Sequence, residues 1–157
     1  MLDFAATGIA NELGADLKPV TPCDAPNRPQ KYVKFAHGTS PESADSINQF
    51  GVDYDAILSF GRGSHSPGAF FTFLLDPTPP LALNLAYEFG LRNTPYPTRP
   101  VVMVGKLPES VFKNLERTGA VYTSPLTGSP LPETIFLPQS FKAINAYNLR
   151  QWEILRP

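Results

Sequence analysis

Prolines constrain the fold of this chain more than any other residue type. Eighteen of its 157 residues are proline, and beyond the first turn of a helix each proline breaks a helix or a strand interior, because its ring fixes φ and removes a backbone donor. Their spacing predicts many rigid turns and short elements. A regular parallel α/β architecture needs longer alternating elements, so we expect an α+β domain with short helices and long Pro-rich loops.

The bulk composition sets the class of molecule. A chain of 157 residues fits one domain with a real core, and 11 Phe and 6 Tyr exclude a disordered chain. Only 17% of residues are charged and the formal net charge is −1. Composition therefore gives no support for a nucleic-acid or membrane partner, and we expect neither.

The chain has few cysteine and histidine residues, which limits disulfide formation and metal binding. Cys23 is the single cysteine, and His37 and His65 are the two histidines. A disulfide framework within the chain is excluded, and we expect no metal site. There is no apolar run of about 20 residues, and no basic segment precedes the first apolar residues. We expect a cytoplasmic protein, or one secreted by a route that needs no signal peptide.

The order of elements predicts a single domain over residues 1–157 with an extended N-terminal arm over residues 1–30. A short helix is expected over residues 1–14, and four prolines keep residues 17–30 extended. The remaining predicted elements follow from periodicity and turn signals. They are strands over residues 32–37, 68–75, 101–105, 135–137, 142–147 and 151–155, helices over 41–50, 81–90 and 108–117, and loops over 52–66 and 121–132.

The stretch over residues 31–73 holds the main candidate site. A short strand runs into His37-Gly38-Thr39, and Ser40 and Pro41 then start a helix in the N-cap and N1 positions. His37 is therefore expected at a strand-to-helix junction. The backbone N–H groups of Gly38 and Thr39 are expected to be available there to a ligand.

These residues resemble the NAD-binding half of the ADP-ribosyltransferase fold. His-Gly-Thr at 37–39, the Gly-Ala-Phe-Phe-Thr strand at 68–72 and Pro-Glu-Thr-Ile-Phe at 132–136 are similar to motifs of its diphtheria-toxin and poly(ADP-ribose)-polymerase branch, the His-Tyr-Glu type. The resemblance covers about residues 33–143 in order, and it implies a split mixed β-sheet. Phe70 replaces the tyrosine of the family's middle motif, although a phenylalanine ring can still stack on nicotinamide.

The resemblance implies a role for each site residue. His37 would bond a ribose hydroxyl of NAD, and the backbone of Gly38 would hold the nicotinamide carboxamide. Thr39 would be a further NAD-binding residue. Phe70 and Tyr87 would sandwich the nicotinamide ring. Glu133 completes the implied set as the catalytic carboxylate, which would accept from the ribose 2′-hydroxyl. Apart from the resemblance, the glycine-flanked loop that holds Arg62 could cover the NAD pyrophosphate, with Arg62 as its charge partner.

Each of these residues also has a plainer interpretation. A histidine at a strand end is often a surface residue, and Phe70 is by default a core residue of which only one face can line a cleft. Tyr87 could be helix packing and Glu133 a solvated acid. The loop that holds Arg62 could be an ordinary surface loop.

The expected function is that of an NAD-dependent mono-ADP-ribosyltransferase, a glycosyltransferase that releases nicotinamide and passes ADP-ribose to a protein or another nucleophile. Its size suits a toxin or effector, which could also have an inhibitor or immunity partner. Three alternatives stay open. They are an NAD glycohydrolase with water as acceptor, an RNA 2′-phosphotransferase, which needs a basic lobe that this chain lacks, and a non-catalytic binding module that retains the fold.

Overall fold

The computed structural model describes residues 30–59 and 68–156. Its contacts divide the chain into residues 1–30 and 31–157, and the description below concerns the second unit. Apart from Gln30, the predicted N-terminal arm lies outside the described residues, as does the helix expected over residues 1–14.

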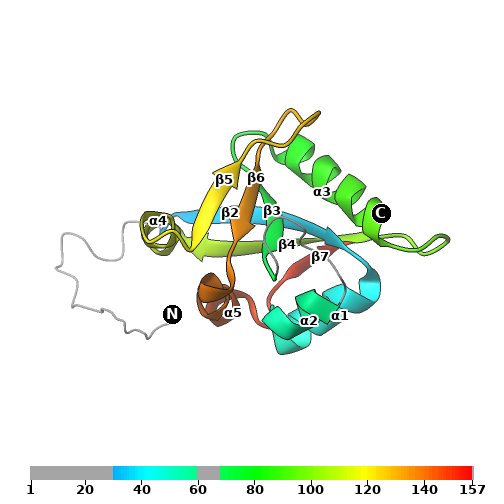
Figure 1. Ribbon diagram of the computed structural model, residues 1–157, viewed down its shortest axis with the longest axis horizontal. Helices are drawn as coiled ribbons and strands as arrows, with labels where there is room; N and C mark the ends of the chain where they lie inside the picture. Colours follow the sequence, from blue (N-terminus) through cyan, green and yellow to red (C-terminus); the bar gives the residue numbers. More distant parts are fainter. Residues whose placement is uncertain (1–29, 60–67, 157) are drawn as a thin grey trace. The chain divides into compact units, whose positions relative to one another are not determined.

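Six strands form one sheet in the order β5-β6-β3-β2-β4-β7 (Figure 1). Every recorded strand pairing in the described residues is antiparallel. The α+β class is as predicted, whereas the sheet is antiparallel and not mixed. The strands are β2 (Tyr32–Thr39), β3 (Phe70–Leu74), β4 (Val101–Pro108), β5 (Val121–Ser124), β6 (Glu133–Phe136) and β7 (Glu153–Leu155).

Short helices connect and cover the strands. Ser40 caps the first of them by accepting from the Ser43 amide at 3.1 Å, and Gly51 ends it at φ 98°, as the sequence pattern indicates. The helices are α1 (Pro41–Phe50), α2 (Tyr54–Ser59), α3 (Pro79–Asn93), α4 (Glu109–Arg117) and α5 (Phe141–Asn148), with a 3-10 turn, η1, at Pro138–Ser140.

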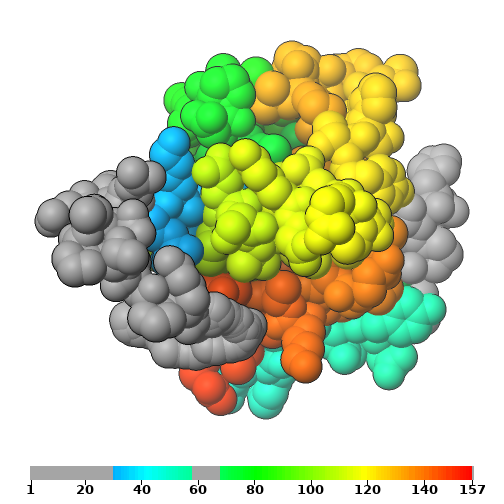
Figure 2. Space-filling model, turned by 90° about the vertical axis from the view of Figure 1, so that its left-hand side faces the viewer, coloured from blue at the N-terminus to red at the C-terminus, as the bar shows by residue number. Residues whose placement is uncertain are grey.

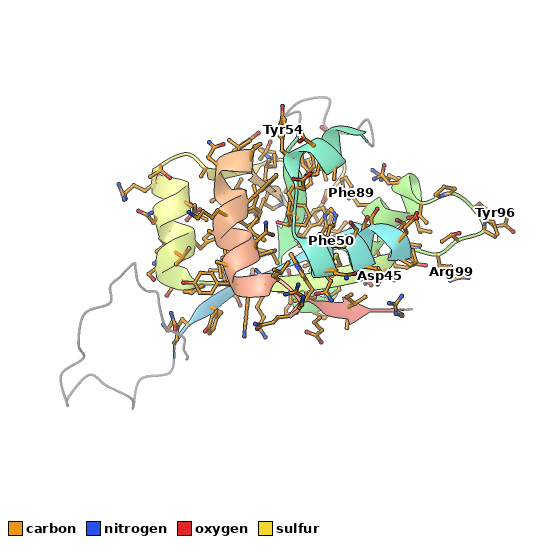
Figure 3. All side chains as sticks on the ribbon, turned by 90° about the horizontal axis from the view of Figure 1, so that it is seen from below. Asp45, Phe50, Tyr54, Phe89, Tyr96 and Arg99 are labelled. Atoms are coloured by element: carbon orange, nitrogen blue, oxygen red, sulfur yellow. The ribbon has the colours of Figure 1, made fainter. Side chains whose placement is uncertain are left out.

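Two cores lie on opposite faces of the sheet, because successive strand residues point to opposite sides. Helix α3 covers one face, and α1, α2 and α5 lie on the other (Figure 1). Helix α4 lies against α5 (Figures 2 and 3). The α5-side core includes Phe35, Phe70, Met103, Phe136, Ile144 and Trp152. The α3-side core is Ala36, Phe73, Ala82, Ala86, Val102 and Val104.

Glycines let α3 approach β2 backbone to backbone. A Cβ at Gly38 would lie 1.7 Å from the Ala86 carbonyl oxygen, and one at Gly90 would lie 3.1 Å from the Thr39 amide nitrogen. Gly38 pairs with Val102 inside β2, so this strand continues past the predicted end at residue 37. Its lack of a side chain serves the contact with α3.

Three segments differ from their predicted structure. Residues 142–147 belong to α5 and not to a strand, and the predicted loops over 52–66 and 121–132 contain α2 and β5. In α5, Phe141, Ile144 and Asn148 recur at helical spacing and are buried. That period outweighs the strand propensity of the aromatic and branched residues.

Candidate functional site

His37 joins the two central strands through its side chain. Its ring stacks on the Phe70 ring with a centroid distance of 4.1 Å and an interplanar angle of 30°. Its Nδ1 lies 2.7 Å from the Phe71 carbonyl oxygen. A carbonyl can only accept, so Nδ1 carries the proton and donates. His37 is half-buried at this position, and it fixes where the start of β3 lies against β2.

The main chain of Gly38 faces the point where the ladder between β2 and β3 stops. Within the described residues, the last recorded pair of that ladder is Ala36 with Phe73. The Leu75 amide donates to the Lys34 carbonyl at 3.0 Å, and alternate residues of a strand face the same neighbour. The N–H and C=O of Gly38 therefore point toward β3 just past the last pair.

Glu133 lies at the start of β6 and is 9% exposed. It pairs with Ser124 of β5, while the next residue of β6, Thr134, pairs with Thr72 of β3. Continuing that register sets Glu133 beside Phe73, which belongs to the α3-side core. Glu133 thus lies on the sheet face that α3 covers.

Phe70 and Tyr87 are on opposite faces of the sheet. Phe70 is 2% exposed in the α5-side core, whereas Tyr87 of α3 packs against the α3-side core. The structure therefore does not bring these two rings together to flank a nicotinamide. The physical reason is the period of the strand, since a shift of one residue moves an aromatic to the other face.

Two aromatic residues outside the predicted set of site residues lie on the Glu133 face. Phe71 is half-buried and alternates with Phe70 along β3, so it shares the face of Phe73. The Phe89 ring lies 5.4 Å from the Phe73 ring, and the Arg92 guanidinium lies 5.2 Å above Phe89. The alternation of β3 could have indicated Phe71, while Phe89 required the orientation of α3.

The other predicted site residues contribute less. Thr39 is buried at the end of β2 and pairs with Val101. Arg62 and the loop that was expected to cover the pyrophosphate lie outside the described residues. In the described ranges no group of three or more His, Cys, Asp or Glu side chains could hold a metal ion, and no helix there is long and apolar enough to cross a membrane.

Comparison of the chain with protein-family models, with curated proteins and with solved structures finds no match.

Proposed function

We propose that this chain is an NAD-dependent mono-ADP-ribosyltransferase whose site lies on the α3 face of the sheet. The observation that carries the proposal is Glu133. It is a carboxylate 9% exposed, and it lies on the same face as Phe71, Phe73 and Phe89. Buried ionisable groups gather at functional sites.

The chemistry suits a buried anion. When the bond between nicotinamide and ribose breaks, its electron pair leaves with the nicotinamide nitrogen, and the ribose acquires oxocarbenium character. A carboxylate beside that ribose stabilises the developing positive charge, and one such contact contributes about 3–4 kcal/mol. The acceptor nucleophile then bonds to the ribose C1′ and releases its proton to water.

The remaining contacts of this proposal come from the main chain and from a revised aromatic pair. The Gly38 N–H and C=O at the end of the β2–β3 ladder match the acceptor and donor of a carboxamide. Phe71 and Phe89 replace Phe70 and Tyr87 as the pair beside the nicotinamide ring. His37 is a positioning residue in this scheme, because it holds the Phe71 carbonyl.

Nicotinamide release from NAD by the full chain tests this function. We expect Glu133→Gln to lower the rate by about 10²–10³-fold, because the amide keeps the volume and removes the charge. The affinity for NAD, measured by calorimetry, should change by less than about threefold because the contact forms in the transition state. Glu116→Gln, which changes an exposed carboxylate of α4, is the matched control and should leave the rate unchanged.

Two results would contradict the proposal. One is that the wild-type chain releases no nicotinamide, with or without a cell lysate that supplies acceptors. The other is that Glu133→Gln keeps the wild-type rate. Release without transfer of label from NAD to protein would instead identify an NAD glycohydrolase that uses the same site.

A further inference from the structure

The loop between α3 and β4 carries a fully exposed aromatic residue on two fixed ends. Tyr96 is 95% exposed, and residues 95–99 are all exposed. The ends of the loop are buried, since Thr94 is 8% exposed and Pro100 is under 2%. Figure 3 shows Tyr96 at the outer end of this segment, with Arg99 nearer the body of the molecule. We call residues 94–100 the Tyr96 loop.

The Tyr96 loop has several restraints on its conformation. The Thr98 amide donates to the Pro95 carbonyl at 3.0 Å and closes the turn that contains Tyr96. Prolines at positions 95, 97 and 100 each have a φ angle that is fixed by the ring. A partner that binds this loop would therefore lose little conformational entropy in ordering it. Exposed tyrosines on ordered loops are frequent anchors of protein interfaces.

The segment that contains the loop carries only positive side-chain charges. Residues 89–105 contain two arginines, Arg92 and Arg99, and no acidic residue. Both arginines are exposed. A tyrosine between arginines complements a protein surface that offers carboxylates around an apolar spot.

The loop ends beside the candidate site. Pro100 is the neighbour that a Cβ at Gly90 would meet at 2.7 Å, and the same Cβ would lie 3.2 Å from the Gly38 carbonyl carbon. Val101, directly after the loop, pairs with Thr39. A protein bound at Tyr96 would thus be held next to the end of β2.

We propose that the Tyr96 loop docks the acceptor protein of the transfer reaction, and that the acceptor presents an acidic patch to it. This inference rests on the proposed transferase function. The loop binds the acceptor and not NAD, so its loss should affect transfer to protein and leave hydrolysis of NAD by water intact.

The experiment measures two rates with the full chain and NAD labelled on its adenine. One is incorporation of label into the proteins of a cell lysate, and the other is nicotinamide release without lysate. We expect Tyr96→Ala to lower incorporation about tenfold or more while release changes less than about twofold. Phe50→Ala, which removes another exposed aromatic ring on α1 that is 76% exposed, should match the wild type in both rates.

Charge is tested at Arg99. We expect Arg99→Glu to lower incorporation and Arg99→Lys to retain most of it, because an acidic patch responds to the sign of the charge. Arg117→Glu on α4 makes the same change in net charge far along the chain and should have no effect. An equal fall in label incorporation in Arg99→Glu and Arg117→Glu would overturn the acidic-patch assignment.

The outcomes separate the two proposals. If the wild type releases no nicotinamide under either condition, the transferase function fails and the docking role fails with it. If release is normal but Tyr96→Ala incorporates label at the wild-type rate, only the docking role fails. An equal fall of both rates in Tyr96→Ala would also overturn docking, because it would indicate a disturbed site. Release without any protein label would exclude an acceptor protein altogether.

Discussion

Thr72 and Thr94 are both buried, but their hydroxyl groups have opposite surroundings. Thr72 Oγ1 donates to the Thr134 carbonyl at 2.9 Å and so links β3 to β6 by a side chain. Thr94 Oγ1 has no hydrogen-bond partner among the described residues. A buried hydroxyl stabilises the fold only when its hydrogen bond replaces the one it loses to water.

Valine substitutions at these two positions should therefore change stability in opposite directions. We expect Thr72→Val to lower the free energy of unfolding by about 1 kcal/mol and Thr94→Val to raise it by up to about 1 kcal/mol. The backbone at Thr94 is extended, with φ −117° and ψ 121°, which suits a β-branched residue. Urea unfolding of the two variants beside the wild type measures both effects, and shifts of the same sign would contradict this account.

Two asparagine side chains attach helix α5 to the rest of the domain. Each of them bonds both the N–H and the C=O of one main-chain residue, as a neighbouring strand would. Asn148 Oδ1 accepts from the Lys106 amide at 2.8 Å, and its Nδ2 donates to the Lys106 carbonyl at 3.0 Å. Asn145 makes the same two contacts with Val52, at 2.8 Å and 3.1 Å. The helix therefore satisfies main-chain groups of β4 and of the turn after α1 with two residues of one type.

Loss of the Asn148 amide should cost more than its surface area indicates. We expect Asn148→Leu to lower the free energy of unfolding by about 3 kcal/mol, because the amide and carbonyl of Lys106 both lose a partner. Asn148→Asp keeps an acceptor for the Lys106 amide, so its free energy of unfolding should lie between those of the wild type and Asn148→Leu. Asn114→Leu on the exposed face of α4 should change stability by less than about 0.5 kcal/mol. Equal effects of the two leucine variants in urea unfolding would contradict the prediction.

The elements with clear start signals or long apolar runs were predictable, and those whose identity depends on a neighbour were not. Ser40-Pro41 and Gly51 bound α1 from local chemistry alone. By contrast β5 has four residues, three of them not buried, and becomes a strand only through its pairing with β6. Strand propensity depends on such context.

The candidate site was predictable in part, for the same reason. The position of Glu133 at the entrance of a strand follows from the sequence, and the structure has it at the first residue of β6. Which face a residue occupies depends on register, and a single step along β3 separates Phe70 from Phe71. The sequence pattern selects an aromatic strand without selecting the ring that faces α3.

At the scale of the whole molecule, the sheet is the only layer that separates the two cores in the described residues. The fluorescence of one tryptophan can report on the packing against this sheet. Trp152, the single tryptophan of the chain, lies on the α5 side, with ring centroids 5.9 Å from Phe35 and 6.0 Å from Phe70. Both phenylalanines belong to central strands. A change in the α3-side core should reach Trp152 through these strands if the domain unfolds as one unit.

Val102→Ala tests this cooperativity from the opposite face. Val102 is 5% exposed in the α3-side core, so the substitution should lower the free energy of unfolding by about 2 kcal/mol. We expect the urea midpoint to fall equally by Trp152 fluorescence and by far-ultraviolet circular dichroism. Thr123→Ala, at an exposed position of β5, is the control. A fluorescence midpoint that stays at the wild-type value would show that the two faces unfold separately.

The short ladder between β2 and β3 has a mechanical consequence. In the described residues this boundary has two recorded residue pairs, against eight between β2 and β4. The sheet therefore consists of two three-stranded halves, β5-β6-β3 and β2-β4-β7, joined by a short ladder. We expect shear within the sheet to concentrate at this ladder. The hydrogen bond from His37 to the Phe71 carbonyl cross-links the two halves of the sheet at this boundary. A molecule bound at both Gly38 and Phe71 would add a second cross-link. The sheet would then resist shear more strongly when the candidate site is occupied.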